Sequence, residues 1–128
     1  MEFKNFNPAE KGLRKTLREY EELAIRHIWD VGEEGANSGK TWEHVNEELG
    51  PGKSISRASI IYFLNRMVDQ GVLGFRDATG KGGHHRIYVT RLDERGYKKY
   101  VVRTLFESVA KDFPEATDEV LGRPGKSR

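Results

Sequence analysis

The chain has 128 residues, enough for one domain with a modest core and an appendage. Hydrophobic residues make up 36% and charged residues 33%, so a partner or a highly charged surface must account for the small apolar share. The absence of cysteine excludes disulfides and thiolate metal sites. The net charge of +2 is too small to indicate, by itself, a polyanionic partner. Neither a membrane-spanning run nor a signal peptide is visible, so we expect a soluble cytoplasmic protein.

The first predicted element is a long helix over about residues 9–31. Its apolar residues recur at steps of three and four, which is typical of one buried helical face. Gly12 lies near the beginning, so the first turn could be frayed or form a separate piece. The helix should end at Gly32, and residues 35–39 should form a loop. The apolar face consists of Leu13, Leu17, Tyr20, Ala24, Ile28 and Val31, widened by Ile25 and Trp29.

Two further helices joined by a turn should follow. Thr41 is expected to cap a helix of about one and a half to two turns, which Gly50-Pro51-Gly52 ends. Ser54 or Ser56 can cap the next helix, because serine hydroxyls accept hydrogen bonds from free backbone amides, and Gly71 offers the left-handed position that ends it. This arrangement is a helix-turn-helix. The apolar stripe of its second helix is Ile60, Phe63, Leu64, Met67 and Val68.

A β-hairpin with a glycine-rich, basic tip is predicted next. Two short strands, at about residues 73–76 and 86–90, flank a loop over residues 77–85. A short helix that leads into a hairpin with a cationic loop is the pattern of a winged helix-turn-helix. The predicted fold class is therefore mainly α with a small β-hairpin, a winged helix-turn-helix with extra N-terminal and C-terminal helices.

The last predicted helix runs from about Asp93 to Phe113 and carries a broad apolar surface. One small domain offers little for this surface to cover, so we expect a second protomer; packing against the first helix of the same chain is the alternative. Residues from Pro114 onward should form a mobile tail. The predicted parts are an N-terminal extension (1–19), the winged-helix domain (20–91), a dimerisation helix (92–113) and the tail (114–128). The predicted dimer contacts are Tyr97, Val101, Leu105, Phe106 and Val109.

The charges are unevenly distributed along the chain. Residues 32–50 hold five acids and one base, whereas residues 53–91 hold seven bases and two acids. The excess of positive charge therefore coincides with the predicted helix and hairpin, and this coincidence favours a nucleic acid over scattered surface lysines.

The N-terminal residues of a recognition helix reach base edges in the major groove of DNA. Ile60 belongs to this N-terminal group, Arg57 could bond guanine, and Asn65 could bond adenine if it points outward with Tyr62. Capping alone remains the alternative role for Ser54 and Ser56. In the hairpin loop, glycine amides and bases should contact the phosphate backbone. The expected DNA contacts are Lys53, Ser54, Ser56, Arg57, Ser59, Tyr62, Asn65, Arg66, Lys81, Gly82, Gly83, His84, His85 and Arg86.

Other kinds of function are less well supported by the residues. His84 and His85 are adjacent in a strand and point to opposite faces, so we expect no metal site, no cofactor and no evident small-molecule effector. No nucleophile has a plausible base nearby, so we expect no enzyme. A protein-interaction module of a larger transcription or chromatin complex is the alternative, although such modules usually lose the basic loop. Double-stranded RNA is less favoured than B-DNA, whose major groove is wide enough for a helix.

The segment ISRASIIYFLNRMVDQGVL, followed by a hairpin ending in RIY, resembles the penicillinase-repressor (BlaI/MecI-like) winged-helix regulators. The earlier segment YEELAIRHIWDVGEEG is similar to the opening helix of that family. The resemblance covers about residues 20–113. It implies a homodimeric repressor in which the C-terminal helix is the dimerisation element. Such a dimer should bind a pseudo-palindromic operator.

Overall fold

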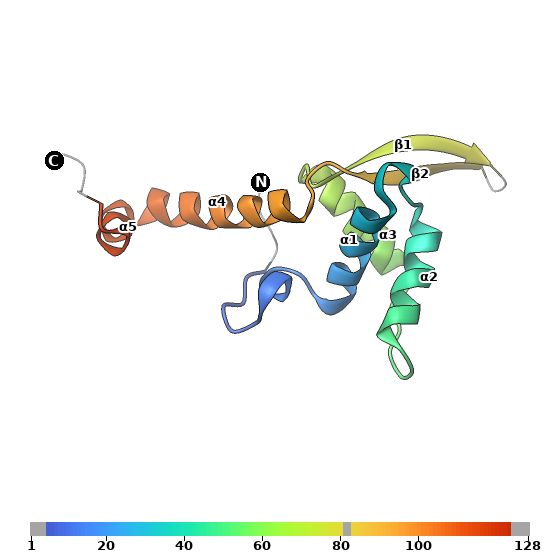
Figure 1. The fold of residues 1–128 in the computed structure, drawn as a ribbon, viewed down its shortest axis with the longest axis horizontal. Coiled ribbons are helices and arrows are strands. Elements are labelled where there is room, and N and C mark those ends of the chain that lie inside the picture. Colours follow the sequence, from blue (N-terminus) through green and yellow to red (C-terminus); the bar gives the residue numbers. More distant parts are fainter. Residues whose placement is uncertain (1–4, 81–82, 124–128) are drawn as a thin grey trace.

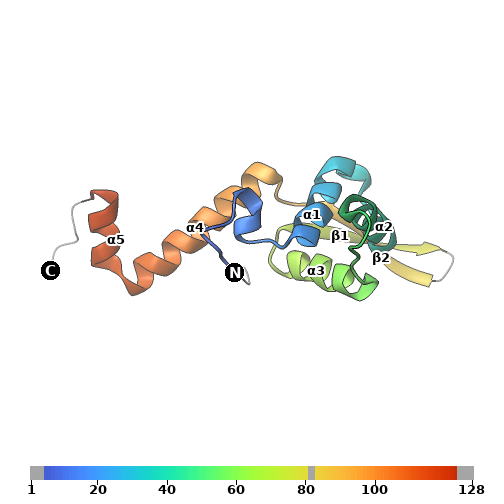
Figure 2. The same cartoon turned by 90° about the horizontal axis from the view of Figure 1, so that it is seen from below.

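A computed structural model describes residues 5–80 and 83–123 of the chain. The fold is mainly helical with one two-stranded antiparallel hairpin, and a long helix extends away from the main body (Figure 1, Figure 2). In chain order the elements are the 3-10 helix η1 (Gly12–Lys15), α1 (Glu19–Val31), the 3-10 helix η2 (Gly32–Glu34), α2 (Ser38–Leu49), α3 (Arg57–Asp69), β1 (Leu73–Gly80), β2 (Gly83–Thr90), α4 (Glu94–Asp112) and α5 (Pro114–Leu121).

The core lies where α1, α2 and α3 meet the base of the hairpin. Leu64, Leu73 and Tyr88 are buried in one cluster, with Trp29 half-buried against it. Ile61, three residues before Leu64 on α3, is by contrast 38% exposed. The fully buried side chains include Ile25, Ile28, Val45, Ile60, Phe63, Leu64, Met67, Val72, Leu73 and Tyr97.

The N-terminal segment does not continue the first helix. The predicted helix over 9–31 is divided into η1 and α1, and residues 16–18 between them are not helical. Gly12 begins η1 with a φ of 58°, a left-handed conformation that an α-helix does not adopt. Glu21 also helps to start α1, because its carboxylate accepts a hydrogen bond from the Arg18 amide at 2.8 Å. The prediction of one continuous helix is therefore wrong, whereas the separate first piece is correct.

Helix α2 begins earlier than predicted and is longer. Asn37, not Thr41, is its N-cap, because the Asn37 side chain accepts a hydrogen bond from the Lys40 amide at 2.8 Å. Thr41 lies within the helix, fully buried, and its hydroxyl donates to the Asn37 carbonyl at 2.9 Å. The predicted end at Gly50 is confirmed.

Both predicted ends of α3 are confirmed. Ser56 is the N-cap, and Gly71 follows the helix with a φ of 81°. The hairpin begins at Leu73 as expected, but its strands extend to Gly80 and from Gly83, so the predicted loop over 77–85 is mostly strand. Backbone hydrogen bonds hold the outer part of these strands together. The sequence does not predict this part, because Asp77 and Thr79 are exposed and the residues do not alternate between apolar and polar.

A β-bridge joins the hairpin to the segment before α2. Ala36 exchanges two backbone hydrogen bonds with Tyr88, at 3.1 and 2.8 Å. Gly35 has a φ of 70°, and a β-carbon placed there would lie 2.5 Å from the Tyr88 carbonyl oxygen. Only glycine allows this close approach of the two backbones.

The two C-terminal helices form an arm that projects from the body (Figure 1). Asp93 caps α4, and only the first turns of α4 are buried, through Tyr97 and Tyr100. The predicted tail from Pro114 is wrong for residues 114–121, which form α5. Pro114 occupies the first turn, where its missing amide is harmless, and Gly122 ends the helix in a left-handed conformation. Residues 124–128 of that predicted tail lie outside the described residues.

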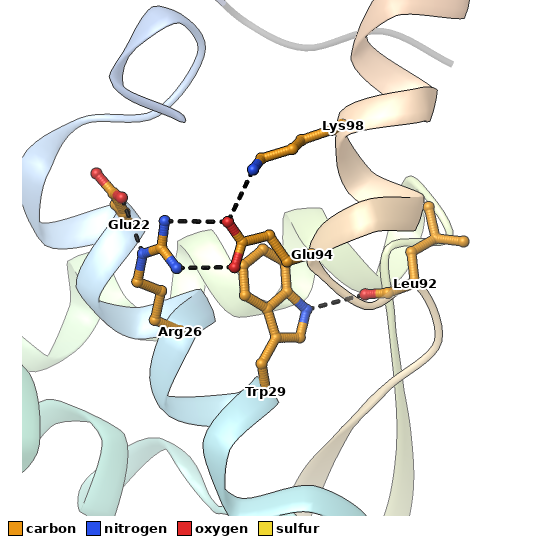
Figure 3. A network of polar contacts seen from close by, with 6 residues as sticks. All are labelled: Glu22, Arg26, Trp29, Leu92, Glu94 and Lys98. Carbon is orange, nitrogen blue, oxygen red and sulfur yellow. Dashed lines mark hydrogen bonds and ion pairs between the residues drawn. The ribbon is translucent and has the colours of Figure 1, made fainter. Parts of the chain in front are cut away.

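The root of the arm is fixed by contacts with α1 (Figure 3). The Trp29 indole donates to the Leu92 carbonyl at 2.9 Å. Arg26 bonds both carboxylate oxygens of Glu94, at 3.0 and 3.4 Å, and its third nitrogen contacts Glu22. Together with a contact from Lys98, Arg26 lowers the pKa of the Glu94 carboxyl. Within residues 5–80 and 83–123, none of the helices combines the length and apolar character needed to cross a membrane.

Candidate nucleic-acid interface

Helix α3 buries one face and leaves the opposite face uncovered. Its inward residues Ile60, Phe63 and Leu64 are fully buried. The interpretation of Ile60 as a base-contacting residue is therefore wrong, because its side chain lies in the core. The outward residues recur at the complementary steps of three and four. They are Arg57, Ala58, Ile61 and Tyr62, all exposed.

The serines before α3 divide between capping and exposure. The Ser56 hydroxyl accepts from the Ser59 amide at 3.1 Å and lies 2.9 Å from the Ser59 hydroxyl. Capping therefore occupies Ser56, whereas Ser54 is exposed before the helix begins. Lys53 is also exposed, and its ammonium forms a surface ion pair with Glu19 at 3.1 Å. Such a pair is weak, so Lys53 can exchange it for another anion.

Arg57 joins the first turns of α3 and α2. Its guanidinium carbon lies 5.9 Å from the centre of the Trp42 ring. A β-carbon at Gly39 would lie 2.9 Å from the guanidinium, so the arginine lies against the first turn of α2. Lys40 is exposed in that same turn. Two helix N-termini, each with partial positive charge, therefore lie close to two cationic side chains.

The turn between α2 and α3 is held by side chains that bond its backbone. The Trp42 indole donates to the Ile55 carbonyl at 2.8 Å. Asn46 accepts from the Ile55 amide at 2.9 Å and donates to the Ile55 carbonyl at 3.3 Å. These bonds fix where α3 begins relative to α2, and hence where Arg57 is presented.

Two polar residues of α3 face the protein instead of the exterior. The Asn65 carbonyl oxygen accepts from Arg86 at 3.0 Å and from the Tyr88 hydroxyl at 2.6 Å, so the outward orientation predicted for Asn65 is wrong. Arg66 forms an ion pair with Glu21 at 3.0 Å, and the two side chains are only 17% and 6% exposed. Arg66 can point inward because the Glu21 carboxylate compensates its charge. Removing either partner would leave the other as a poorly solvated, unpaired charge.

The basic residue Arg86 of the hairpin contacts other side chains of the protein. The Arg86 guanidinium lies 3.8 Å from the centre of the Phe75 ring, in addition to its bond to Asn65. Arg86 therefore stabilises the hairpin against α3 and is not a free phosphate contact. Nearer the tip, the His84 imidazole lies 3.2 Å from the Asp77 carboxylate across the two strands. The predicted contacts Lys81 and Gly82 lie outside the described residues.

The remaining tip residues differ in exposure. Gly83 and His84 are exposed, and His85 is half-buried. Gly83 has a φ of 97°, so the chain returns from the tip in a conformation that favours glycine. Across the described ranges, no three His, Asp or Glu side chains gather closely enough to hold a metal ion.

The predicted dimer contacts do not form one exposed set. Tyr97 is fully buried within its own chain, so its assignment to an interface is wrong. Burial raises the pKa of Tyr97 to about 12, and Tyr100 packs beside it. Val101, Leu105 and Phe106 are half-exposed and Val109 is 41% exposed. The predicted dimer contacts leave out other exposed apolar residues of the arm, which are Val102, Phe113, Val120 and Leu121.

Two half-buried histidines link α1 to α2. The His27 and His44 rings stack with their centres 4.4 Å apart. Burial, and secondarily the neighbouring His44, lowers the pKa of His27.

Comparison with models of known protein families gives no match, and comparison with curated protein sequences gives none either.

Proposed function

We propose that this chain is a sequence-specific DNA-binding transcriptional regulator that acts as a homodimer and carries a winged helix-turn-helix. The observation that supports this most directly is the uncovered face of α3, which opens with Arg57 beside the first turn of α2. A helix of this kind inserts into the major groove, where its N-terminal residues reach base edges.

The order of elements supports the winged-helix assignment. A first helix is followed by a one-residue bridge at Ala36, two helices joined by a fixed turn, and an antiparallel hairpin. The bridge supplies a third, minimal strand beside β2. In this proposal β1 and β2 form the wing, and the wing lies along the phosphate backbone.

The charges favour DNA as the partner. Lys40, Lys53 and Arg57 are exposed at or near the first turns of α2 and α3, where helix dipoles add partial positive charge. Phosphate contacts of this kind position a protein on the duplex, and the face of α3 reads the sequence. Ser54, Tyr62 and Arg57 are the residues that we assign to that reading.

The arm supports dimerisation, and the resemblance to penicillinase repressors supports repression. Val102 is 66% exposed and Phe113 is 62% exposed, a large apolar surface for a helix that the body does not cover within the described residues. Two copies joined by their arms would present two α3 helices to a pseudo-palindromic operator.

A protein-interaction module is the second candidate function, and a specific observation favours it. Ile61 and Tyr62, 38% and 59% exposed, lie on the same face of α3 as Arg57. Because Asn65 and Arg66 point inward, this face is less polar than the sequence pattern predicts. Aromatic and apolar side chains are typical anchors of protein interfaces.

Fluorescence anisotropy of a labelled random duplex, titrated at several salt concentrations, tests the proposal. We expect binding that weakens as salt rises, because bound phosphates release counterions. Arg57→Ala should weaken binding about tenfold or more, whereas Lys11→Ala, which removes an exposed charge before η1, should change it little. Salt-independent or undetectable binding would overturn DNA recognition and favour the interaction module.

A further inference from the structure

The arm formed by α4 and α5 has opposite charges in its two halves. Residues 94–103, next to the body, hold four bases and one acid. Residues 104–123, farther from the body, hold five acids and two bases. Two of these acids lie in α4 and three lie in α5, which turns away from the axis of α4 (Figure 2). Figure 1 shows that this distal half lies far from the body, so the basic surface of α3 does not neutralise it.

The same arm carries exposed apolar side chains from Val102 onward. Val102 and Val109 lie on one side of α4, seven residues apart and therefore two helical turns apart. Phe113 continues this side at the end of the helix, and Val120 of α5 is 86% exposed. An exposed apolar stripe flanked by charges is typical of a helix that pairs with another helix.

The charge pattern indicates which helix is complementary to it. A helix with an acidic segment opposite the basic half and a basic segment opposite the acidic half would be complementary to the arm. Its charges would therefore follow one another in the reverse order along the arm. A second copy of the same arm, running in the opposite direction, meets both needs at once. A two-fold axis across the arm generates this arrangement, because it pairs each half with the other half of its partner.

We propose that two arms pair antiparallel, so that the basic half of each arm faces the acidic half of its partner. This inference rests on the proposed homodimer and specifies its geometry. Parallel pairing would bring the two net-basic halves together and the two net-acidic halves together, which is repulsive. The apolar stripe supplies affinity, and the charges select the direction.

Charge reversal tests the direction of pairing. The basic-half variant is Arg95→Glu, Lys99→Glu and Arg103→Glu, and the acidic-half variant is Glu107→Lys, Asp112→Lys and Glu119→Lys. These six residues are all exposed, and Glu94 and Lys98 at the root remain unchanged. Each three-residue variant should weaken the dimer about 10- to 100-fold in sedimentation equilibrium, whereas the variant with all six changes should dimerise like the wild type.

Mixing distinguishes the two directions. The six-residue variant should not form mixed dimers with the wild type, because antiparallel pairing would then place like charges together. Preferential mixed dimers would indicate parallel arms and overturn the proposal. Unfolding of each variant by heat, followed by circular dichroism, identifies any loss of dimer that comes from loss of fold.

The wild-type chain provides an independent measurement without any substitution. Antiparallel arms attract each other, so the dimer should dissociate more readily as the salt concentration rises from about 0.05 to 0.5 M. A dimer that tightens with salt would overturn the antiparallel arrangement alone. A monomer at all salt concentrations would overturn the homodimer of the proposed function, and the anisotropy titration would still report on DNA binding separately.

Discussion

The hydroxyl of Tyr97 lies 2.7 Å from the hydroxyl of Thr16, and both side chains are buried although 81 residues separate them. This contact joins the first turn of α4 to the segment between η1 and α1. The N-terminal segment therefore packs against the root of the arm instead of extending a helix, and it contributes to holding the arm in place.

Tyr97→Phe should destabilise the protein by about 1–3 kcal/mol, because it leaves the buried Thr16 hydroxyl without its bond to the tyrosine. Urea unfolding followed by tryptophan fluorescence measures this loss. Thr16→Val in the same background should recover part of it, since both polar partners are then absent. Equal and additive losses for the two substitutions would mean that the hydroxyls do not interact.

Stability should fall in mild acid through His27. The pKa of His27 is lowered in the folded protein, mainly by burial, so protons bind the unfolded chain preferentially. The free energy of unfolding should therefore be constant above about pH 6.5 and decrease as the pH falls below that value. His27→Gln should flatten this part of the profile, and an unchanged slope in the variant would assign the acid sensitivity to other groups.

Leu64→Ala should cost about 2–5 kcal/mol, because Leu64 is fully buried at the centre of the core and its loss leaves a cavity. Ile61→Ala is the matched control on the same helix, since Ile61 is partly exposed, and it should cost much less. Urea titration of both variants measures the difference. Similar losses would show that the orientation of α3 differs from the one described.

Asn46→Ala should disturb the turn before α3 without removing any exposed charge. Asn46 makes two bonds to the backbone of Ile55, so its loss should cost about 1–3 kcal/mol and loosen the start of α3. Hydrogen exchange of the Ile55 amide should accelerate. DNA affinity should fall in parallel if the position of Arg57 depends on this turn, and unchanged affinity would separate the turn from recognition.

The elements with strong local signals could be predicted from the sequence. Ser56 and Gly71 mark both ends of α3, and Asp93 marks the beginning of α4, because each of these residues satisfies a local backbone requirement. A cap at Thr41 predicts too short a helix α2, because Asn37 offers a stronger capping side chain four residues earlier. Helix α5 differs from the predicted tail, because proline ends one helix but is also favourable in the first turn of the next.

The orientation of the candidate DNA contacts was less predictable, because it depends on partners distant in the sequence. Asn65 and Arg86 bond each other across 21 residues, and Arg66 bonds Glu21 across 45 residues. The sequence shows only that these residues are polar, and a polar residue on a helix is ordinarily expected to face the solvent. It does not show the distant partners that turn them inward. Arg57 could be predicted to be exposed, because its position at the first turn of α3 is local.

The fixed root of the arm has a consequence for spacing. Thr16, Trp29 and Gln70, from three separate segments, each bond a residue at or near the start of α4. The angle between arm and body is therefore set by the folded chain and not by a flexible hinge. In a dimer joined through its arms, the distance between the two α3 helices would therefore be fixed. Such a dimer would bind operators with one half-site spacing and would bind poorly to operators with inserted or deleted base pairs.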